Sequence, residues 1–155
     1  MAGVVEKRLK ELGIALPQAA SPVANYVPFV VAGNLVFVSG QVTLVDGKPQ
    51  YVGQLGRDFA VEDGAKAARI CALNVLAQLK AACGGDLDKV QRCVRLTGFV
   101  NATADFKDHP KVVNGASDLM VEVLGDKGRH SRAAVGVASL PLGVAVEVDG
   151  IFQIA

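Results

Sequence analysis

The feature that most constrains the fold of this chain is a long amphipathic helix, predicted from about Val61 to Cys83. Acidic residues open this helix and Lys80 lies in its last turn, as the helix dipole favours, and Gly84-Gly85 end it. A helix with one apolar stripe needs an apolar surface on which to pack. The stripe recurs at three- to four-residue spacing, at Ala67, Ile70, Leu73, Leu76 and Leu79.

The segments on either side of the helix predict β-strands and further helices. Gly33-Asn34 is a two-residue hairpin signal between two β-rich runs. Pro110 and Gly125 mark the start and the end of a second main helix. The other expected elements, in chain order, are a short helix at 4–12, a loop at 17–22, strands at 29–32 and 35–39, a turn at 46–47, a strand at 90–100, the second main helix at 110–124, and strands at 132–138 and 144–152.

The size and composition of the chain fit one domain. A chain of 155 residues with 51% hydrophobic and 20% charged residues can bury a real core and is not typical of disorder. No internal repeat, linker or low-complexity segment is visible. The sequence therefore predicts a single α/β domain over 1–155, in which 1–22 forms an N-terminal helix and loop extension.

Two of the expected strands carry apolar or small residues on both faces, at 35–38 and at 133–138. Two main helices can cover only one face of a small sheet, so the other face needs a second cover. Another copy of the chain is the economical candidate. This predicts a homo-oligomer and makes a subunit interface a natural place for a pocket.

The charge balance and the absence of long apolar runs limit the classes of partner. The net charge is +1 and lacks the basic footprint of a dedicated nucleic-acid binder. No apolar run approaches the roughly 20 residues that span a bilayer, and no signal-peptide apolar region follows the charged start. We therefore expect a cytoplasmic protein with neither a nucleic acid nor a membrane as partner.

The remaining motifs argue against cofactor and metal chemistry. The three cysteines have no CxxC spacing, and neither His109 nor His130 has metal-ligand spacing or an evident catalytic context. No glycine-rich phosphate loop and no nucleophile elbow is present. The sequence thus favours anion capture and acid–base work on a small molecule, without a cofactor and without a metal.

Arg132 and Glu147 are the leading candidates for that chemistry. Arg132 stands directly before a strand of small and apolar residues, where a guanidinium is suited to bidentate capture of a carboxylate. Glu147 interrupts a β-branched run, and partial burial would raise its pKa toward the range useful for proton transfer. We expect the last strands to hold the two residues near each other. Spacing alone leaves a structural ion pair as the slightly favoured alternative to a site.

Weaker signals surround this pair. Ser39-Gly40-Gln41 ends a strand, where glycine lets the backbone approach a ligand or a neighbouring subunit, although it is also an ordinary turn. Tyr26 offers a hydroxyl and a ring face, but half-buried tyrosines are more often simply packed. Asn114 can serve as a hydrogen-bonding pocket residue, and an exposed helix asparagine is the commoner case.

Taken in order, several motifs resemble one known family over nearly the whole chain after about residue 22. The ordered set is specific, whereas each piece alone is not. The motifs are Asn25-Tyr26-Val27, the run from Gly33 to Gln41, Val113-Asn114-Gly115, and Arg132 followed by Leu140-Pro141 and Val146-Glu147-Val148. The sequence is thus similar to the Rid family, also called the YjgF/YER057c/UK114 family and often named endoribonuclease L-PSP. The N-terminal helix, Gly-Ala-Ser-Asp-Leu and Gly-Arg-His resemble a longer subgroup of it.

The resemblance implies a fold, an assembly and an activity. The fold is chorismate-mutase-like, α/β in the broad sense and α+β in the narrow one, with a mixed β-sheet and two main helices packed on one face. It implies a homotrimer with pockets in the clefts between subunits. The activity is hydrolysis of reactive 2-imino acids, such as 2-aminoacrylate, to 2-keto acids and ammonia by a hydrolase acting on C=N, without a cofactor.

The resemblance also assigns residues. Arg132 matches the family's carboxylate-binding arginine, and Glu147 the acidic position that activates or places water. The positions matching the substrate-binding pocket, or lying in its surrounding pattern, are Tyr26, Asn114, Gly33, Gln41 and Ala134. Ala133-Ala134 depart from the Ser-Cys that often follows the arginine, and this departure bears on substrate choice more than on fold.

Three functions follow from the sequence. The leading one is an enamine or imine deaminase. The alternative is a non-catalytic module that binds small carboxylates or keto acids in the same cleft. An endoribonuclease is less favoured, because the near-neutral charge and the absence of a catalytic histidine pair argue against it.

Overall fold

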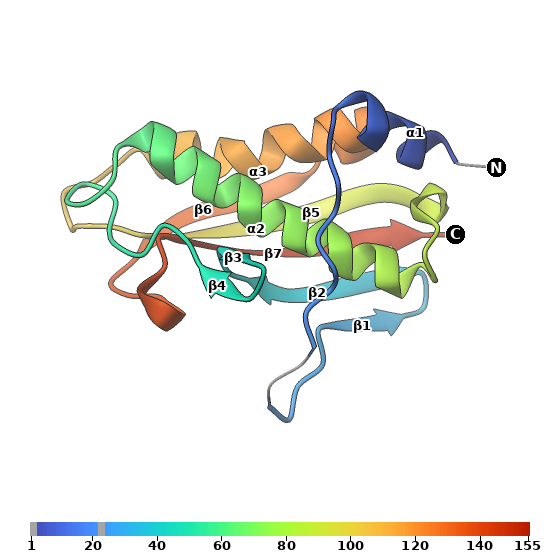
Figure 1. The fold of residues 1–155 in the computed structure, drawn as a ribbon, viewed down its shortest axis with the longest axis horizontal. Helices are drawn as coiled ribbons and strands as arrows, with labels where there is room; N and C mark the ends of the chain where they lie inside the picture. Colours follow the sequence, from blue (N-terminus) through green and yellow to red (C-terminus); the bar gives the residue numbers. More distant parts are fainter. Residues whose placement is uncertain (1–2, 22–23) are drawn as a thin grey trace.

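The computed structural model describes residues 3–21 and 24–155 (Figure 1). Pro22, the last residue of the predicted loop and of the predicted extension, lies outside the described residues, as do residues 1 and 2. The elements are α1 (Val4–Glu11), β1 (Phe29–Ala32), β2 (Leu35–Gln41), β3 (Leu44–Val45), β4 (Lys48–Pro49), α2 (Val61–Ala82), the 3-10 turn η1 (Leu87–Lys89), β5 (Val90–Asn101), α3 (His109–Leu124), η2 (Gly125–Gly128), β6 (Ser131–Val137), η3 (Pro141–Gly143) and β7 (Val146–Ile154).

Every helix and strand expected from the sequence is present, with small shifts at the ends. The largest shift is in the last strand, which begins at Val146 because Val144 closes a turn onto Pro141 and Ala145 bonds to Tyr51. The short hairpin β3–β4 was not expected. It forms around the predicted turn at Asp46-Gly47, where both residues adopt positive φ.

Five strands form one mixed sheet in the order β1-β2-β7-β5-β6. The pairs are antiparallel except β5 and β6, which are parallel and are connected through α3. Helices α2 and α3 lie side by side on one face of this sheet (Figure 1). The prediction of a mixed sheet with two main helices on one face is confirmed.

The alternation of β7 divides its residues between the two faces of the sheet. Val146, Val148 and Phe152 are fully buried against the helices. Glu147 and Asp149 point to the opposite face and are only partly buried. A strand whose alternate residues lie in the core therefore also carries two carboxyl groups away from it.

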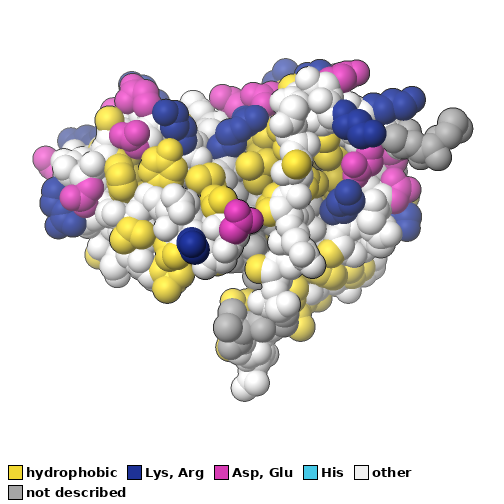
Figure 2. Space-filling model, viewed as in Figure 1, with side chains coloured by type: hydrophobic (Ala, Val, Ile, Leu, Met, Phe, Trp, Pro, Cys, Tyr) yellow, Lys and Arg dark blue, Asp and Glu magenta, His cyan; other side chains and the backbone are white. Residues whose placement is uncertain are grey.

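The face without helices is apolar in part. Phe37 is 40% exposed, Val30 50% and Val135 43%, and all three point away from the helix layer according to their strand pairing. The prediction that the helices leave one apolar face uncovered is therefore confirmed for this chain. On the helix side, Figure 2 shows positive and negative side chains interspersed around apolar ones.

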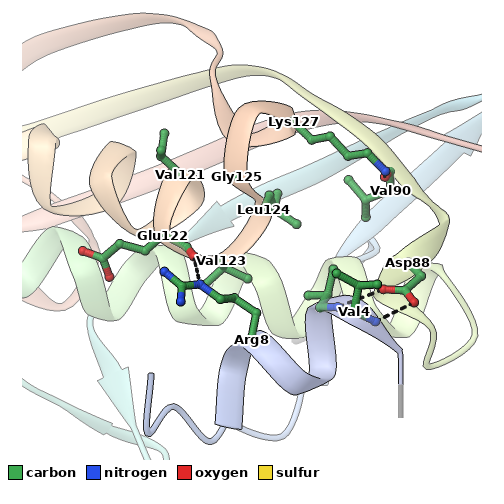
Figure 3. A pocket seen from close by; sticks show the side chains of 11 residues that line it. Val4, Arg8, Asp88, Val90, Val121, Glu122, Val123, Leu124, Gly125 and Lys127 are labelled. Carbon is green, nitrogen blue, oxygen red and sulfur yellow. Dashed lines mark hydrogen bonds between the residues drawn. The ribbon is translucent and has the colours of Figure 1, made fainter. Parts of the chain in front are cut away.

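The N-terminal helix α1 is fixed to the domain at both ends (Figure 3). The backbone N–H groups of Val4 and Val5 each donate to the Asp88 carboxylate at 2.9 Å, and these bonds hold the pKa of Asp88 below its usual range. Arg8 Nε donates to the carbonyl oxygen of Glu122 at 2.8 Å. A carboxylate at a helix N-terminus also interacts favourably with the helix dipole, so Asp88 caps α1 from a distant part of the chain.

None of the helices in residues 3–21 and 24–155 is both long and apolar enough to cross a membrane.

The contact between α2 and α3 includes Gly115, where the backbones of the two helices lie close together. A Cβ at Gly115 would meet the backbone carbonyl of Ala65, which cannot rotate away as a side chain can. We predict that Gly115→Ala destabilises the fold by about 1 to 3 kcal/mol, although alanine is the better helix former. Urea denaturation measures this. Asn114→Ala, an exposed neighbour on the same helix, is the control and should be near neutral. A stabilised Gly115→Ala variant would show that the helices can separate without cost.

Candidate functional site

Arg132 lies on β6 and its side chain points to the helix face of the sheet. It pairs with the buried Leu96 of β5, and paired residues of neighbouring strands share a face. Its Nη1 donates to Ser117 Oγ at 3.0 Å, and its Nη2 donates to the carbonyl oxygen of Pro110 at 3.3 Å. Helix α3 therefore supplies both of its contacts.

Both partners of the half-buried Arg132 guanidinium are neutral. Within the part of the chain that the structure describes, the ion pairs formed by arginines involve other residues and not this one. A cation removed in part from water, with hydrogen bonds but without a counter-charge, attracts an anion. Of its five N–H donors, these two bonds use two.

Behind Arg132, Ser117 belongs to a chain of hydrogen bonds. Its Oγ lies 2.9 Å from His130 Nε2, and His130 Nδ1 lies 2.6 Å from the carbonyl oxygen of Gly128. The sequence analysis gave Ser117 no role, and it found no evident catalytic context for His130. Residues 117 and 130 come together only because η2 folds the chain back from the end of α3 to β6.

Glu147 lies on the opposite face of the sheet. It pairs with Phe99 of β5, and its carboxylate lies against Gly40, where a Cβ would come within 2.6 Å of Oε1. Gly40 sits at the irregularity in the β2–β7 pairing. Burial, and then the neighbouring Asp149 carboxylate, raise the pKa of Glu147. The predicted direction of this pKa shift is confirmed.

The expectation that one chain holds Arg132 near Glu147 is wrong. Strand β5 lies between β6 and β7, and the two side chains leave the sheet on opposite faces. The strands were identified correctly, but the side-chain period of two sends one residue to each face. The structural ion pair that spacing alone slightly favoured does not form within the chain, and the assignment of both as site residues stays a prediction.

Glu147 shares a cavity of about 670 Å³ with two other predicted residues, Tyr26 and Gln41. Tyr26 is 54% exposed, and Gln41 Nε2 donates to the carbonyl oxygen of Ser39 at 3.0 Å. Gly40 also lines this cavity, as do residues 17–21 and the polar side chains Asn74 and Gln78 of α2. The sequence analysis noted the Ser-Gly-Gln element but selected only its glutamine.

The remaining predicted residues divide between the two sides. Ala134 follows Arg132 by two positions on β6 and shares its face. Asn114 lies one helical turn from both Pro110 and Ser117, and therefore on the side of α3 that contacts Arg132. Gly33 is in neither group, since it forms the exposed β1–β2 turn with φ of 60° at the other end of β2 from Gln41.

Two further cavities contain none of the predicted site residues. One, of about 490 Å³, lies between α1, the start of β5 and the end of α3 (Figure 3). The other, of about 550 Å³, is lined by His109, Phe106 and the end of β6. No group of His, Cys, Asp or Glu residues within 3–21 and 24–155 could hold a metal ion.

Residues 6–151 match the model of the family described as "YjgF/chorismate mutase-like, putative endoribonuclease". The chain belongs to this family. The resemblance drawn from the ordered motifs is thereby confirmed, and with it the chorismate-mutase-like fold.

Relatives match the chain over nearly its whole length. Protein TCP17 of Trypanosoma cruzi is 49% identical over 153 residues, which cover 98% of this chain and 95% of that protein. The crystal structure of Atu1372 from Agrobacterium tumefaciens, described as having unknown function, is 51% identical with a TM-score of 0.92, covering 98% and 93% of the two chains. A Shewanella oneidensis protein described as a "putative endoribonuclease" is 38% identical with a TM-score of 0.93, covering 98% and 100%.

The raised pKa of Glu147 leads to a pH-dependent prediction. Because the folded pKa lies above the unfolded value of about 4.3, the folded chain binds more protons in the interval between them, and stability falls as pH rises through that interval. Glu147→Gln removes this fall. The urea midpoint of the variant minus that of the unmodified protein should therefore be larger at about pH 7 than at about pH 4.

Asp118→Asn is the control for this measurement, because Asp118 is an exposed carboxyl group on α3. It should leave the difference between the two pH values unchanged. The same pH response in both variants would contradict a specific effect of burial at Glu147.

Proposed function

We propose that the protein is an enamine/imine deaminase that hydrolyses 2-imino acids to 2-keto acids and ammonia. The observation that carries this proposal is the half-buried guanidinium of Arg132, bonded to Ser117 and Pro110 but to no carboxylate of the described chain. A 2-imino acid presents a carboxylate for this cation, with an electrophilic carbon directly beside it. Capture of the carboxylate fixes the position of that carbon.

Glu147 is suited to handle the water. Its pKa is raised by partial burial, which brings a carboxyl group closer to the pH at which it can both take and return a proton. The cavity that it lines with Tyr26 and Gln41 has room for a small molecule. The adjacent Gly40 leaves one side of the carboxylate free of a side chain.

A second copy of the chain is needed to bring these two halves together. Arg132, Ala134 and Asn114 lie at the β6–α3 side, whereas Glu147 and Tyr26 lie at the cavity on the other side of the sheet. Because β6 is an edge strand of the described sheet, packing of a second copy along that edge would bring the arginine side of one copy to the glutamate side of another. This arrangement corresponds to the homotrimer with interfacial pockets that the resemblance implies.

The reaction balances without a cofactor. An enamine such as 2-aminoacrylate first tautomerises to the imine. Water then adds across the C=N bond, its oxygen to carbon, while Glu147 accepts one water proton and the imine nitrogen gains a proton from solvent. The C–N bond of the resulting carbinolamine breaks as the hydroxyl proton is released to solvent, and ammonia departs with a proton returned by Glu147. The products are the 2-keto acid and ammonia.

Endoribonuclease activity, which the family description names, is the less favoured hypothesis for this chain. Acid–base cleavage of RNA needs phosphate-binding cations, and the net charge here is +1. Both nitrogens of the His130 ring lie against Ser117 and Gly128, while His109 packs on Phe106. An assay of RNA cleavage by highly purified protein tests this hypothesis separately from the deaminase hypothesis.

We predict that Arg132→Ala lowers kcat/KM for 2-aminoacrylate, generated in situ, by at least about 100-fold, because the charged hydrogen bonds to the carboxylate are lost. Arg132→Lys keeps the charge but not the planar pair of donors and should recover only part of the activity. The rate of imine decay with and without protein is the measurement.

Arg129→Ala is the matched control, because Arg129 is an exposed arginine three positions away that pairs with Asp126. It should keep full activity. Equal imine decay with and without the unmodified protein would reject the deaminase proposal. Arg132-dependent binding of a keto acid without any turnover would instead identify the non-catalytic carboxylate-binding module.

The proposed assembly gives a separate prediction. Phe37→Glu places a charge on the apolar open face and should convert the oligomer into monomers with a folded core, because Phe37 contributes nothing to the helix-side core. Analytical ultracentrifugation measures the mass. Val45→Glu, an exposed apolar residue of the short β3–β4 hairpin outside this sheet, is the control and should leave the mass unchanged. An unmodified protein that is monomeric would contradict the assembly.

A further inference from the structure

We propose that Ser117 and His130 are positioning residues for Arg132, and that their hydrogen-bond relay makes the site select an ionised carboxylate over its neutral amide. The inference deepens the proposed function, since it rests on Arg132 as the carboxylate anchor. The relay runs from the Gly128 carbonyl through His130 and Ser117 to the guanidinium.

The direction of each hydrogen bond follows from chemistry at the two ends of the relay. The Gly128 carbonyl can only accept, so His130 Nδ1, 2.6 Å away, carries the proton. In the neutral ring Nε2 is then the acceptor, and Ser117 donates its hydroxyl proton to it across 2.9 Å. At the other end, a guanidinium can only donate, so Arg132 Nη1 gives its proton to Ser117 Oγ across 3.0 Å.

The relay therefore holds Arg132 without neutralising it. A carboxylate in place of Ser117 would pair with the guanidinium and compete with the ligand. The serine hydroxyl and the Pro110 carbonyl instead supply two neutral acceptors on one helix, which orient the guanidinium plane while its charge remains available.

The same hydrogen bonds determine which donors and acceptors face the ligand. Ser117 donates its hydroxyl hydrogen bond to His130 and accepts one from Arg132, so the His130 Nε2 lone pair is occupied and the serine oxygen keeps one lone pair. The three remaining N–H groups of the guanidinium are donors. A carboxylate presents only acceptors and satisfies them, whereas the NH₂ group of a primary amide turns donors toward the guanidinium donors and loses part of its hydration without compensation.

The Ser117–His130 pair also resembles the nucleophile and base of a hydrolase, but its setting differs. Ser117 lies in the middle of α3, and its oxygen accepts from a cation. The pair thus acts through Arg132 and does not attack a substrate itself.

The test compares binding of pyruvate and pyruvamide by calorimetry in the full-length protein and its variants. The unmodified protein should bind pyruvate at least tenfold more tightly than pyruvamide. Ser117→Ala should weaken pyruvate binding about tenfold and narrow the preference for the carboxylate, whereas Ser117→Thr, which keeps a hydroxyl, should restore both. Ser131→Ala is the matched control, because its hydroxyl bonds to Val94 and not to Arg132.

His130 provides an independent readout. ¹⁵N NMR of the imidazole should show the proton on Nδ1 and an unprotonated Nε2 in the unmodified protein. His130→Gln, which can place an amide oxygen near the Nε2 position, should keep more of the carboxylate preference than His130→Ala. A proton on Nε2, or Ser117→Ala and His130→Ala variants with unchanged preference, would overturn the relay.

These outcomes separate the relay from the deaminase. If the protein hydrolyses imines but the Ser117 and His130 variants keep the KM and the carboxylate preference of the unmodified protein, the relay is wrong and the proposed function stands. If carboxylate binding depends on Ser117 but no imine is turned over, the relay stands and the deaminase fails. In an active enzyme, Ser117→Ala should raise KM more than it lowers kcat, as expected for loss of ground-state binding.

Discussion

Coverage of the sheet on one face only is the constraint on which the rest of the structure depends. Helices α2 and α3 bury Val146, Val148 and Phe152 of β7, so the alternate residues of the same strand must leave on the other face. Glu147 is one of these residues. Its position, partial burial and raised pKa therefore follow from the way in which the core is built, and not from a separate device.

The same alternation explains why Arg132 and Glu147 do not meet within the chain. Arg132 is aligned with Leu96, whereas Glu147 is aligned with Phe99, an odd number of positions further along β5. A cation on the helix face and a carboxyl group on the open face cannot neutralise each other. Within the described chain the guanidinium therefore has no anion beside it, and the carboxyl group has no cation. Two such groups are a suitable starting point for a site shared between copies.

Much of the fold was predictable because its signals are local. The stripe of α2, the hairpin glycine at Gly33 and the Pro–Gly bounds of α3 each depend on neighbouring residues. The hydrogen-bond relay behind Arg132 was not predictable, because a helix crossover and a 3-10 turn bring Ser117 to Arg132 and His130 to Ser117. Gly40 was not selected as a site residue for a similar reason. Its place beside Glu147 depends on a register shift between β2 and β7, and the periodicity of one strand does not reveal such a shift.

If each copy carries one half of the pocket, activity and assembly are coupled by mass action. Dilution below the dissociation constant of the oligomer would separate Arg132 from its partner's carboxyl group and stop turnover, while the Ser117 relay, which lies within one chain, would remain intact. Carboxylate binding to Arg132 alone would then be weak but measurable in the monomer. On this hypothesis the oligomer would be the deaminase, and the monomer would be the carboxylate-binding module.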